Sequence, residues 1–292
     1  MYKSLSTAIQ DAESRGVRLC DVALEAESLD HARPIEEIRA ALRRALGVMR
    51  EAVGRGAVGD LKSASGLVGG DAAKLRDGPG GPLSGTPFRD VLMRALAVQE
   101  VNAAMGVIVA APTAGGAGVL PAVLTGLADA RTLDDEALID ALATAGLIGA
   151  VVAERASLSG AEGGCQAETG AAAGMAAGAA VEMLGGTPSQ VGHAVALAQQ
   201  GTLGLICDPL GGLVELPCVF RNATGSAIAL AAVEMALAGI EFAIPADEVI
   251  DTMGQIGREM DVRYRETAGG GLAATPTGRR LAKERLYQLK RS

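Results

Sequence analysis

Three cysteines within residues 162–222 constrain the fold of this chain more than any other feature of its sequence. Cys165, Cys207 and Cys218 each have a Gly or Pro within two positions, and bent backbone of this kind presents a thiolate to a metal. Their spacing of 42 and then 11 positions excludes a C-x-x-C finger or a ferredoxin run. If they serve one metal centre, the fold must bring distant segments together.

Small apolar side chains supply most of the material for a core. Hydrophobic residues make up 49% of the 292 residues but aromatic residues only 2%, and there are 40 glycines. Residues 169–181 are almost all Ala and Gly, which predicts a helix that packs against its neighbours at short range. No convincing period-two pattern of a strand occurs, so we predict an all-α fold with a single compact helical domain and Gly-rich loops.

Apolar residues recur every three or four positions in most of the chain, which predicts a series of helices. Pro34 suits the start of one helix, and Thr132 with Asp135 resembles a capping box at the start of another. The ranges that the pattern predicts to be helical are 4–12, 19–29, 34–54, 86–99, 119–127, 169–181, 222–240 and 246–259. It also predicts a helix through 138–152 and one that begins at Thr187 or Ser189 and bears His193.

The net charge of −8 and the pI of about 5.0 argue against nucleic acid or an anionic membrane surface as a partner. Two uncharged stretches, 102–128 and 183–207, have the apolarity of membrane spans, but Pro, Gly, Gln and His interrupt them. We interpret both as buried parts of a soluble protein. Four cysteines in so long a chain, with no signal peptide after Met1, predict the reducing cytoplasm; a structural disulfide is the alternative.

Two glycine-rich segments interrupt the helical pattern. Residues 59–83 carry Lys62, Ser63 and Ser65 among glycines, a composition that suits a structureless linker as well as a ligand loop. Residues 112–118, P-T-A-G-G-A-G, break an apolar run and leave backbone polar groups that need partners. A ligand or a tight turn in the core would both satisfy them.

Several motifs occur in the order that they have in one enzyme family. They are K-S-A-S-G-L-V-G-G-D-A-A-K (62–74), P-T-A-G-G-A-G-V-L-P-A (112–122), E-G-G-C-Q-A-E (162–168) and D-P-L-G-G-L-V-E-L-P-C-V-F-R-N (208–222). In these motifs the chain resembles the alpha subunit of the iron-sulfur-dependent L-serine dehydratases, also called L-serine ammonia-lyases. The resemblance runs from Ser4 to about Leu281. It implies a helical catalytic domain with N-terminal helices (1–56), a cluster and substrate core (57–281) and a charged tail (282–292).

The resemblance implies a [4Fe-4S] cluster rather than pyridoxal phosphate. Three cysteines leave one iron of a cubane without a thiolate, and that iron can act as a Lewis acid on the hydroxyl and carboxylate of L-serine. The implied reaction is dehydration of L-serine to aminoacrylate, which rearranges and hydrolyses to pyruvate and ammonia. Single-chain relatives carry an additional regulatory part, so the resemblance implies a separate beta subunit and an oligomer.

A base must also remove the α-proton of the substrate. His193, 14 residues before Cys207 in an apolar segment, is the leading candidate, although a lone histidine there also suits a protein core. Lys62 ranks second. The other predicted site residues are the metal ligands Cys165, Cys207 and Cys218 and the substrate contacts Ser63, Ser65, Gly66, Thr113, Arg221 and Asn222.

Two other functions suit the same features. A related iron-sulfur lyase acting on another amino acid, such as L-cysteine, would use the same thiols and open iron. A non-enzymatic iron-sulfur sensor or scaffold would need no substrate pocket, whereas the loops 62–74 and 112–122 resemble one. Glu162, Glu168 and Glu215, close to the cysteines in sequence, suit either supporting contacts around the site or plain exposure to solvent.

Overall fold

Helices supply all the regular structure in residues 2–289, the part of the chain that this computed structural model describes. In that range there is no strand, and a single isolated bridge joins Cys207 to Arg265. The predicted all-α fold is confirmed. The α-helices are α1 (Leu5–Arg15), α2 (Leu19–His31), α3 (Ile35–Ala57), α4 (Asp71–Asp77), α5 (Pro87–Ala103), α6 (Val119–Arg131), α7 (Asp135–Arg155), α8 (Gly160–Gly163), α9 (Ala171–Met183), α10 (Pro188–Gln200), α11 (Cys218–Leu237), α12 (Ala246–Glu259) and α13 (Pro276–Leu289). A π-helix, η1 (Gln166–Gly170), precedes α9, and η2 (Leu210–Gly212), η3 (Val262–Tyr264) and η4 (Gly271–Ala274) are 3₁₀ turns.

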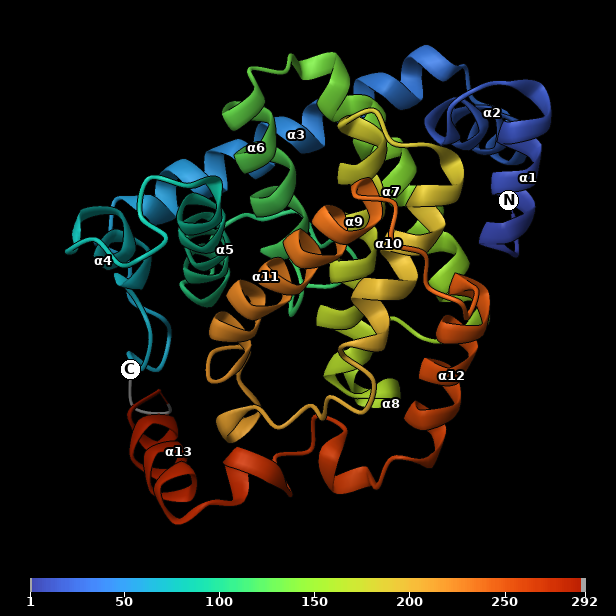
Figure 1. Ribbon diagram of the computed structural model, residues 1–292. Coiled ribbons are helices and arrows are strands. Elements are labelled where there is room, and N and C mark those ends of the chain that lie inside the picture. The colour runs from blue at the N-terminus through green and yellow to red at the C-terminus, as the bar shows by residue number, and fades with distance from the viewer. Residues whose placement is uncertain (1, 290–292) are drawn as a thin grey trace.

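The α9 helix forms the centre of the core because its small residues let other helices approach closely. Its residues 171–181 are all buried, and α6, α7, α10 and α11 pack against it. A Cβ at Gly178 would lie 2.6 Å from Ile148 Cδ1 of α7 and 2.9 Å from Val195 Cγ2 of α10, so only glycine permits this packing. Figure 1 shows α9 and α10 side by side, with α11 crossing the middle of the molecule.

One predicted helix start is wrong. Thr132 does not cap α7 together with Asp135, because α6 continues to Arg131 and Thr132 ends that helix in the left-handed conformation (φ 55°). Asp134 caps α7 instead, and its side chain accepts a hydrogen bond from Ala137 N at 3.0 Å.

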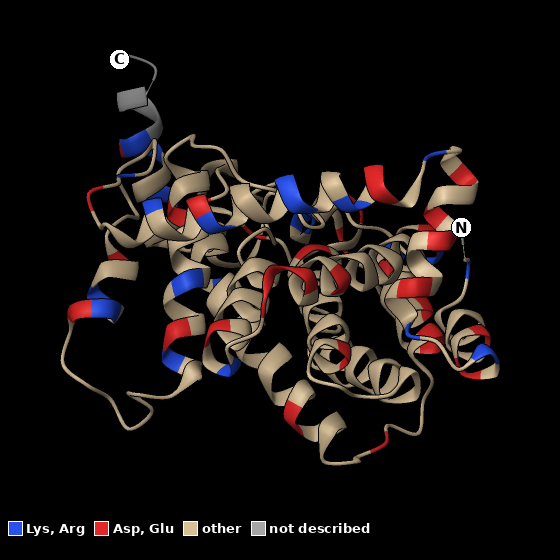
Figure 2. Cartoon of the chain, turned by 90° about the horizontal axis from the view of Figure 1, so that it is seen from above, with Lys and Arg blue, Asp and Glu red and all other residues tan. Residues whose placement is uncertain are grey.

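The uncharged stretches at 102–128 and 183–207 do not form helices that are long enough to cross a membrane. Their principal helices, α6 and α10, each have 13 residues, whereas a span needs about 20. Among the described residues, α7 is the one helix that is long and apolar enough to cross a membrane. Of its most apolar 18-residue segment, 67% is buried inside the fold. Figure 2 shows charged residues mainly on the outer helices; α10 carries none.

Asp247, at the start of α12, fastens α1 to the rest of the fold. Its carboxylate accepts hydrogen bonds from Ser4 Oγ (2.9 Å), Leu5 N (2.8 Å) and Ser6 N (3.0 Å), which are donors at the start of α1. Burial raises the pKa of Asp247, but these hydrogen bonds outweigh it and the pKa is lowered overall. Because the folded pKa is lowered, the stabilisation is present above the ordinary aspartate pKa and is lost as the pH falls through the lowered one.

Replacing Asp247 by alanine is expected to lower the free energy of unfolding by roughly 2 kcal/mol at pH 7, because three donors lose a charged partner. The control is Asp251→Ala on the same helix, whose side chain is 50% exposed and pairs with Arg155; it is expected to cost less than about 0.5 kcal/mol. Thermal unfolding at pH 7 and in acid measures both, and the difference between Asp247→Ala and wild type should shrink in acid. Equal losses in the two variants would contradict the role given to Asp247.

Candidate active site

The fold brings the three predicted cysteine ligands together from separate segments. Cys165 directly precedes η1, Cys207 lies in the loop after α10, and Cys218 is the first residue of α11. All three are free thiols and at most 3% exposed. The three thiols are near enough to affect one another's ionisation, since Cys165 and Cys218 both act on Cys207.

The closeness of Cys165 and Cys207 makes the acidities of these two thiols different. The interaction with Cys207 lowers the pKa of the Cys165 thiol, and the interaction with Cys165 raises that of the Cys207 thiol. Burial raises the pKa of Cys218 to about 12. The Arg221 guanidinium further favours the thiolate of Cys165. The thiolate is the form of cysteine that binds a metal.

Gln166, the neighbour of Cys165, ties three parts of the chain together. Its fully buried side chain donates from Nε2 to Gly163 O (2.9 Å) and Met253 O (3.1 Å), and its Oε1 accepts from Gly204 N (2.9 Å). These contacts join α8, α12 and the loop that leads to the second cysteine. The π-turn that Gln166 begins is a helix form found frequently at functional sites.

Glu168 places a buried carboxylate between Cys207 and the 112–118 loop. It is 9% exposed, its Oε1 accepts a hydrogen bond from Thr113 Oγ1 (2.8 Å), and its Oε2 lies 3.9 Å from Cys207 Sγ. Burial raises the pKa of Glu168 to about 7. Of the two sequence interpretations of this residue, exposure to solvent is wrong. The spacing of three residues from Cys165 is the signal for a shared helix face.

Glycines in the 112–118 loop and at the start of α8 leave the space that Glu168 occupies. A Cβ at Gly115 would lie 2.8 Å from both carboxylate oxygens, and a Cβ at Gly160 would lie 2.6 Å from Oε2 and 3.1 Å from Cys207 Sγ. A Cβ at Gly116 would lie 2.8 Å from the backbone oxygen of Glu168. The glycine-rich composition of 112–118 therefore permits close packing around one carboxylate.

Asn222 fixes the same loop from the other side. The residue is fully buried on α11, and its Oδ1 accepts from Gly118 N (2.9 Å). Its Nδ2 donates to Gly115 O (2.7 Å) and to Cys218 O (2.9 Å). Both amide donors are used by the backbone, so Asn222 positions the loop and has no donor left for a ligand.

Arg221 lies beside the cysteines at the wall of a cavity. Its Nη1 donates to Ile206 O (2.9 Å), and its Nη2 pairs with Asp208 Oδ1 (2.7 Å). The cavity has a volume of about 560 Å³, and Thr169 also lines it. Thr169 Oγ1 is 3.2 Å from Cys165 Sγ, so this wall of the cavity lies one side chain away from the first thiol.

The serines of the 62–74 loop are bound to a second buried carboxylate. Ser63 Oγ donates to Glu215 Oε2 (2.7 Å), Ser65 Oγ donates to the same oxygen, and Ser65 N donates to Oε1 (3.0 Å). Each hydroxyl has one proton and gives it to Glu215, which is 3% exposed, so in this arrangement neither can donate to a substrate. Gly66 forms an exposed turn (φ 72°), and Lys62 is exposed.

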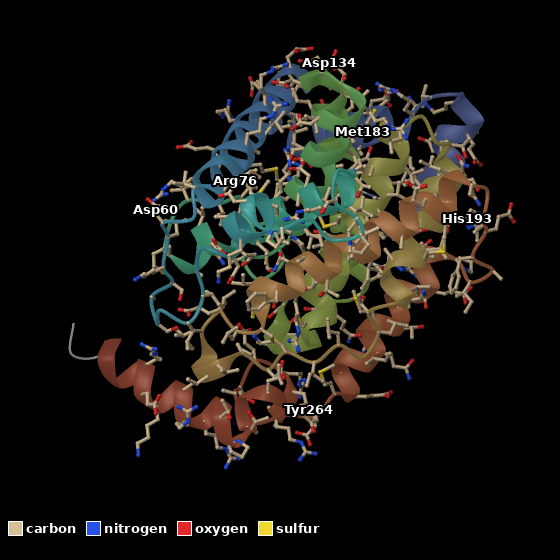
Figure 3. All side chains as sticks on the ribbon, turned by 60° about the vertical axis from the view of Figure 1, so that its left-hand side comes forward. Asp60, Arg76, Asp134, Met183, His193 and Tyr264 are labelled. Atoms are coloured by element: carbon tan, nitrogen blue, oxygen red, sulfur yellow. The ribbon has the colours of Figure 1, made fainter. Side chains whose placement is uncertain are left out.

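The structure does not bring His193 to the cysteines. Its Nδ1 accepts a hydrogen bond from Phe242 N (3.2 Å), next to α1 and the α11–α12 connection. It lies seven residues before the end of α10, roughly 10 Å along the helix axis. Tyr264, whose carbonyl accepts from Cys207 N (2.8 Å), marks the cysteine region in Figure 3, where His193 lies at a different edge.

Thiolates are suitable ligands for an iron-sulfur cluster. Within residues 2–289, no three Cys, His, Asp or Glu side chains are placed to ligate one ion. A cubane does not need this arrangement, because each thiolate binds a different iron. Three buried thiols beside a cavity, with no Cβ at Gly160 to crowd Cys207, are compatible with such a group.

Similarity to known proteins agrees with this geometry. The family model described as "Serine dehydratase alpha chain" matches residues 14–273, a range that contains all the site residues described above. The chain is 48% identical to "Probable L-serine dehydratase, alpha chain" of Bacillus subtilis, over 97% of this chain and 95% of the relative. It is 38% identical to "L-serine dehydratase, alpha chain" of Peptoniphilus asaccharolyticus, over 99% of both chains.

A longer relative matches over part of its length. "L-serine dehydratase" of Streptomyces coelicolor is 42% identical over 82% of this chain and 53% of its own length. The resemblance predicted from the motifs is confirmed. This chain belongs to the serine dehydratase alpha chain family, whose members are lyases.

Proposed function

We propose that this protein is the catalytic alpha chain of a [4Fe-4S]-dependent L-serine dehydratase, which converts L-serine to pyruvate and ammonia together with a separate beta subunit. The observation that carries the proposal is the meeting of three buried free thiols with Arg221 and Glu168. The names of the relatives support the substrate and the beta partner. An oligomer in the cytoplasm is the setting that we propose for it.

Cys165, Cys207 and Cys218 would hold the cluster. When bound, the cluster supplies a Lewis-acidic iron that has no cysteine ligand. Arg221 would bind the carboxylate of L-serine through charge-assisted hydrogen bonds, since it lines the cavity next to Cys165. The burial of all three thiols keeps water away from them.

We assign removal of the α-proton to Glu168 Oε2 in place of His193 or Lys62. Glu168 is the carboxylate that contacts Cys207, and the hydrogen bond from Thr113 holds its other oxygen. A base with a pKa near 7 is ionised in a large fraction of molecules at neutral pH and still accepts a proton readily. His193 is fixed to Phe242 at a distance from the thiols, and Lys62 is exposed.

Anaerobic assay of the reconstituted chain tests this function. Pyruvate formed from L-serine is measured with and without the beta chain, and pyruvate and sulfide formed from L-cysteine are measured in parallel. Turnover of L-serine in the complex, well above that of L-cysteine, is the expected result. Preference for L-cysteine would show that the protein is a related lyase acting on that amino acid. A stable cluster without turnover of either amino acid would favour a sensor or scaffold.

Gly115→Ala is expected to lower kcat/KM for L-serine by at least ~10-fold, because the new Cβ must displace the Glu168 carboxylate and small misplacements of catalytic groups are costly. Gly54→Ala is the matched control, since a Cβ on that residue of α3 meets nothing within 4 Å. Steady-state kinetics of the two reconstituted variants measures the effect. Identical kcat/KM values would show that the packing of Gly115 on Glu168 does not matter for catalysis.

A further inference from the structure

Asp208 is a buried carboxylate that joins the cysteine site to the C-terminal part of the chain. It follows Cys207 directly and is 1% exposed. Its Oδ1 pairs with Arg221 Nη2 at 2.7 Å, and its Oδ2 accepts a hydrogen bond from Leu272 N at 2.6 Å. One side chain therefore contacts α11 on one side and η4 on the other.

The segment that Asp208 contacts is the C-terminal strap, residues 262–275, which connects α12 to α13 (Figure 1). The strap also pairs with the backbone of Cys207, since Cys207 N donates to Tyr264 O (2.8 Å) and Glu266 N donates to Cys207 O (2.9 Å). Gly271 has φ 57°, and a Cβ there would lie 2.2 Å from Asp208 Oδ2. Glycine is needed at this position for both reasons, so the strap is shaped to reach the carboxylate.

The same carboxylate restricts the orientation of Arg221. A long arginine side chain has many rotamers, but here Asp208 binds one terminal nitrogen and Ile206 O binds the other. The guanidinium is thereby held at the cavity wall and close to Cys165. A guanidinium has five N–H donors, so Arg221 can serve a ligand carboxylate in addition to these two partners, and an arginine recognises a carboxylate best when its planar group is already oriented.

We propose that Asp208 is a positioning residue, which orients Arg221 for the substrate carboxylate. Through its hydrogen bond with Leu272 N, it also couples the orientation of Arg221 to the position of the C-terminal strap. The inference rests on the proposed reaction with L-serine. It predicts that Asp208 affects substrate binding only when Arg221 is present. It also predicts that a substitution of Arg221 changes the amide exchange of Leu272 in the strap.

Asp208→Asn in the reconstituted complex with the beta chain is the first test. Asparagine keeps the size and can accept from Leu272 N, but it loses the charge that orients Arg221. KM for L-serine is expected to rise at least ~10-fold, while kcat changes less than about 3-fold and iron content is unchanged. In an Arg221→Gln background, Asp208→Asn is expected to change KM no further. Asp261→Asn, directly before the strap and with its side chain bonded to Arg263, is the control that keeps the wild-type KM.

Amide hydrogen exchange of the chain without substrate gives a second test that does not depend on activity. In Arg221→Lys, which cannot bind Asp208 and Ile206 O in the same way, exchange at Leu272 is expected to be faster than in wild type. An unchanged KM in Asp208→Asn, a KM increase that persists in the Arg221→Gln background, or unchanged exchange at Leu272 in Arg221→Lys would each overturn the inference. Absence of L-serine turnover in the wild type would instead overturn the proposed function.

Discussion

Cys207→Ala is expected to abolish L-serine dehydration, with kcat lowered by at least ~10³-fold, because the cluster loses one of its three thiolate ligands. Cys165→Ala and Cys218→Ala should have the same effect, since the three thiols lie together in the fold. The loss should appear first in the iron and sulfide content of the reconstituted protein and only as a result in its activity. Iron analysis before the assay distinguishes these steps.

Cys20→Ala is the matched control for these variants. Cys20 is also a buried free thiol, but it lies on α2, where its sulfur contacts Asp21 and its backbone N donates to Glu182. The variant is expected to retain the iron content and kcat of the wild type. The assignment of the ligands would be wrong if Cys20→Ala lost the cluster, or if any of the other three variants kept it with full activity.

Glu168→Gln is expected to lower kcat by ~10²–10⁴-fold with the cluster retained, which is the usual contribution of a general base. Glutamine has nearly the same shape and still accepts the hydrogen bond from Thr113, but its amide cannot take up the α-proton. Wild-type kcat/KM should rise with pH as Glu168 ionises, since burial raises the pKa of this carboxyl to about 7 and the base acts when deprotonated. The variant should lack this acid limb.

Glu182→Gln provides the control for Glu168→Gln. Glu182 on α9 is another carboxyl whose pKa is raised by burial, and it contacts Thr144 and the backbone of Cys20 rather than the cysteine site. Kinetics and the pH profile of this variant should follow the wild type. Near wild-type kcat in Glu168→Gln would show that Glu168 does not remove the α-proton. His193 and Lys62 would then again be the candidates for the base.

Most of the longer helices were predictable from the sequence because each depends on a local pattern, whereas α4, α8 and α13 lie in ranges for which no helix was predicted. The run of Ala and Gly at 169–181 forms the central helix from residue 171, and the helix expected at 246–259 has those boundaries in the structure. The start of α7 was predicted wrongly because the true end of α6 takes up Thr132, which the local pattern does not show.

Site residues were harder to predict because their roles depend on contacts between distant segments. The motif order pointed to the cysteines, but nothing in the sequence shows that Ser63 and Ser65 donate to Glu215. Asn222 was expected to bind substrate, and its amide is instead used by the backbone. The location of His193 depends on the direction of α10, which leads away from the cysteines as it runs back from residue 200.

Acidic residues next to the cysteines were undervalued for the same reason. Glutamate and aspartate are usually exposed, so residue type alone predicts that the side chains of Glu168 and Asp208 face solvent. Both are buried here because Gly115, Gly160 and Gly271 leave room for their carboxylates. Glycines of this kind are therefore informative once they are paired with the nearest acidic residue in space.

The measurement that tests the central claim most directly is the iron and acid-labile sulfide content of the chain after anaerobic reconstitution. If Cys165, Cys207 and Cys218 hold a cubane, about four iron and four sulfide per chain are expected, falling sharply in each of the three alanine variants and unchanged in Cys20→Ala. A chain that takes up no iron and sulfide, or binds a single zinc through these thiols, would contradict the account.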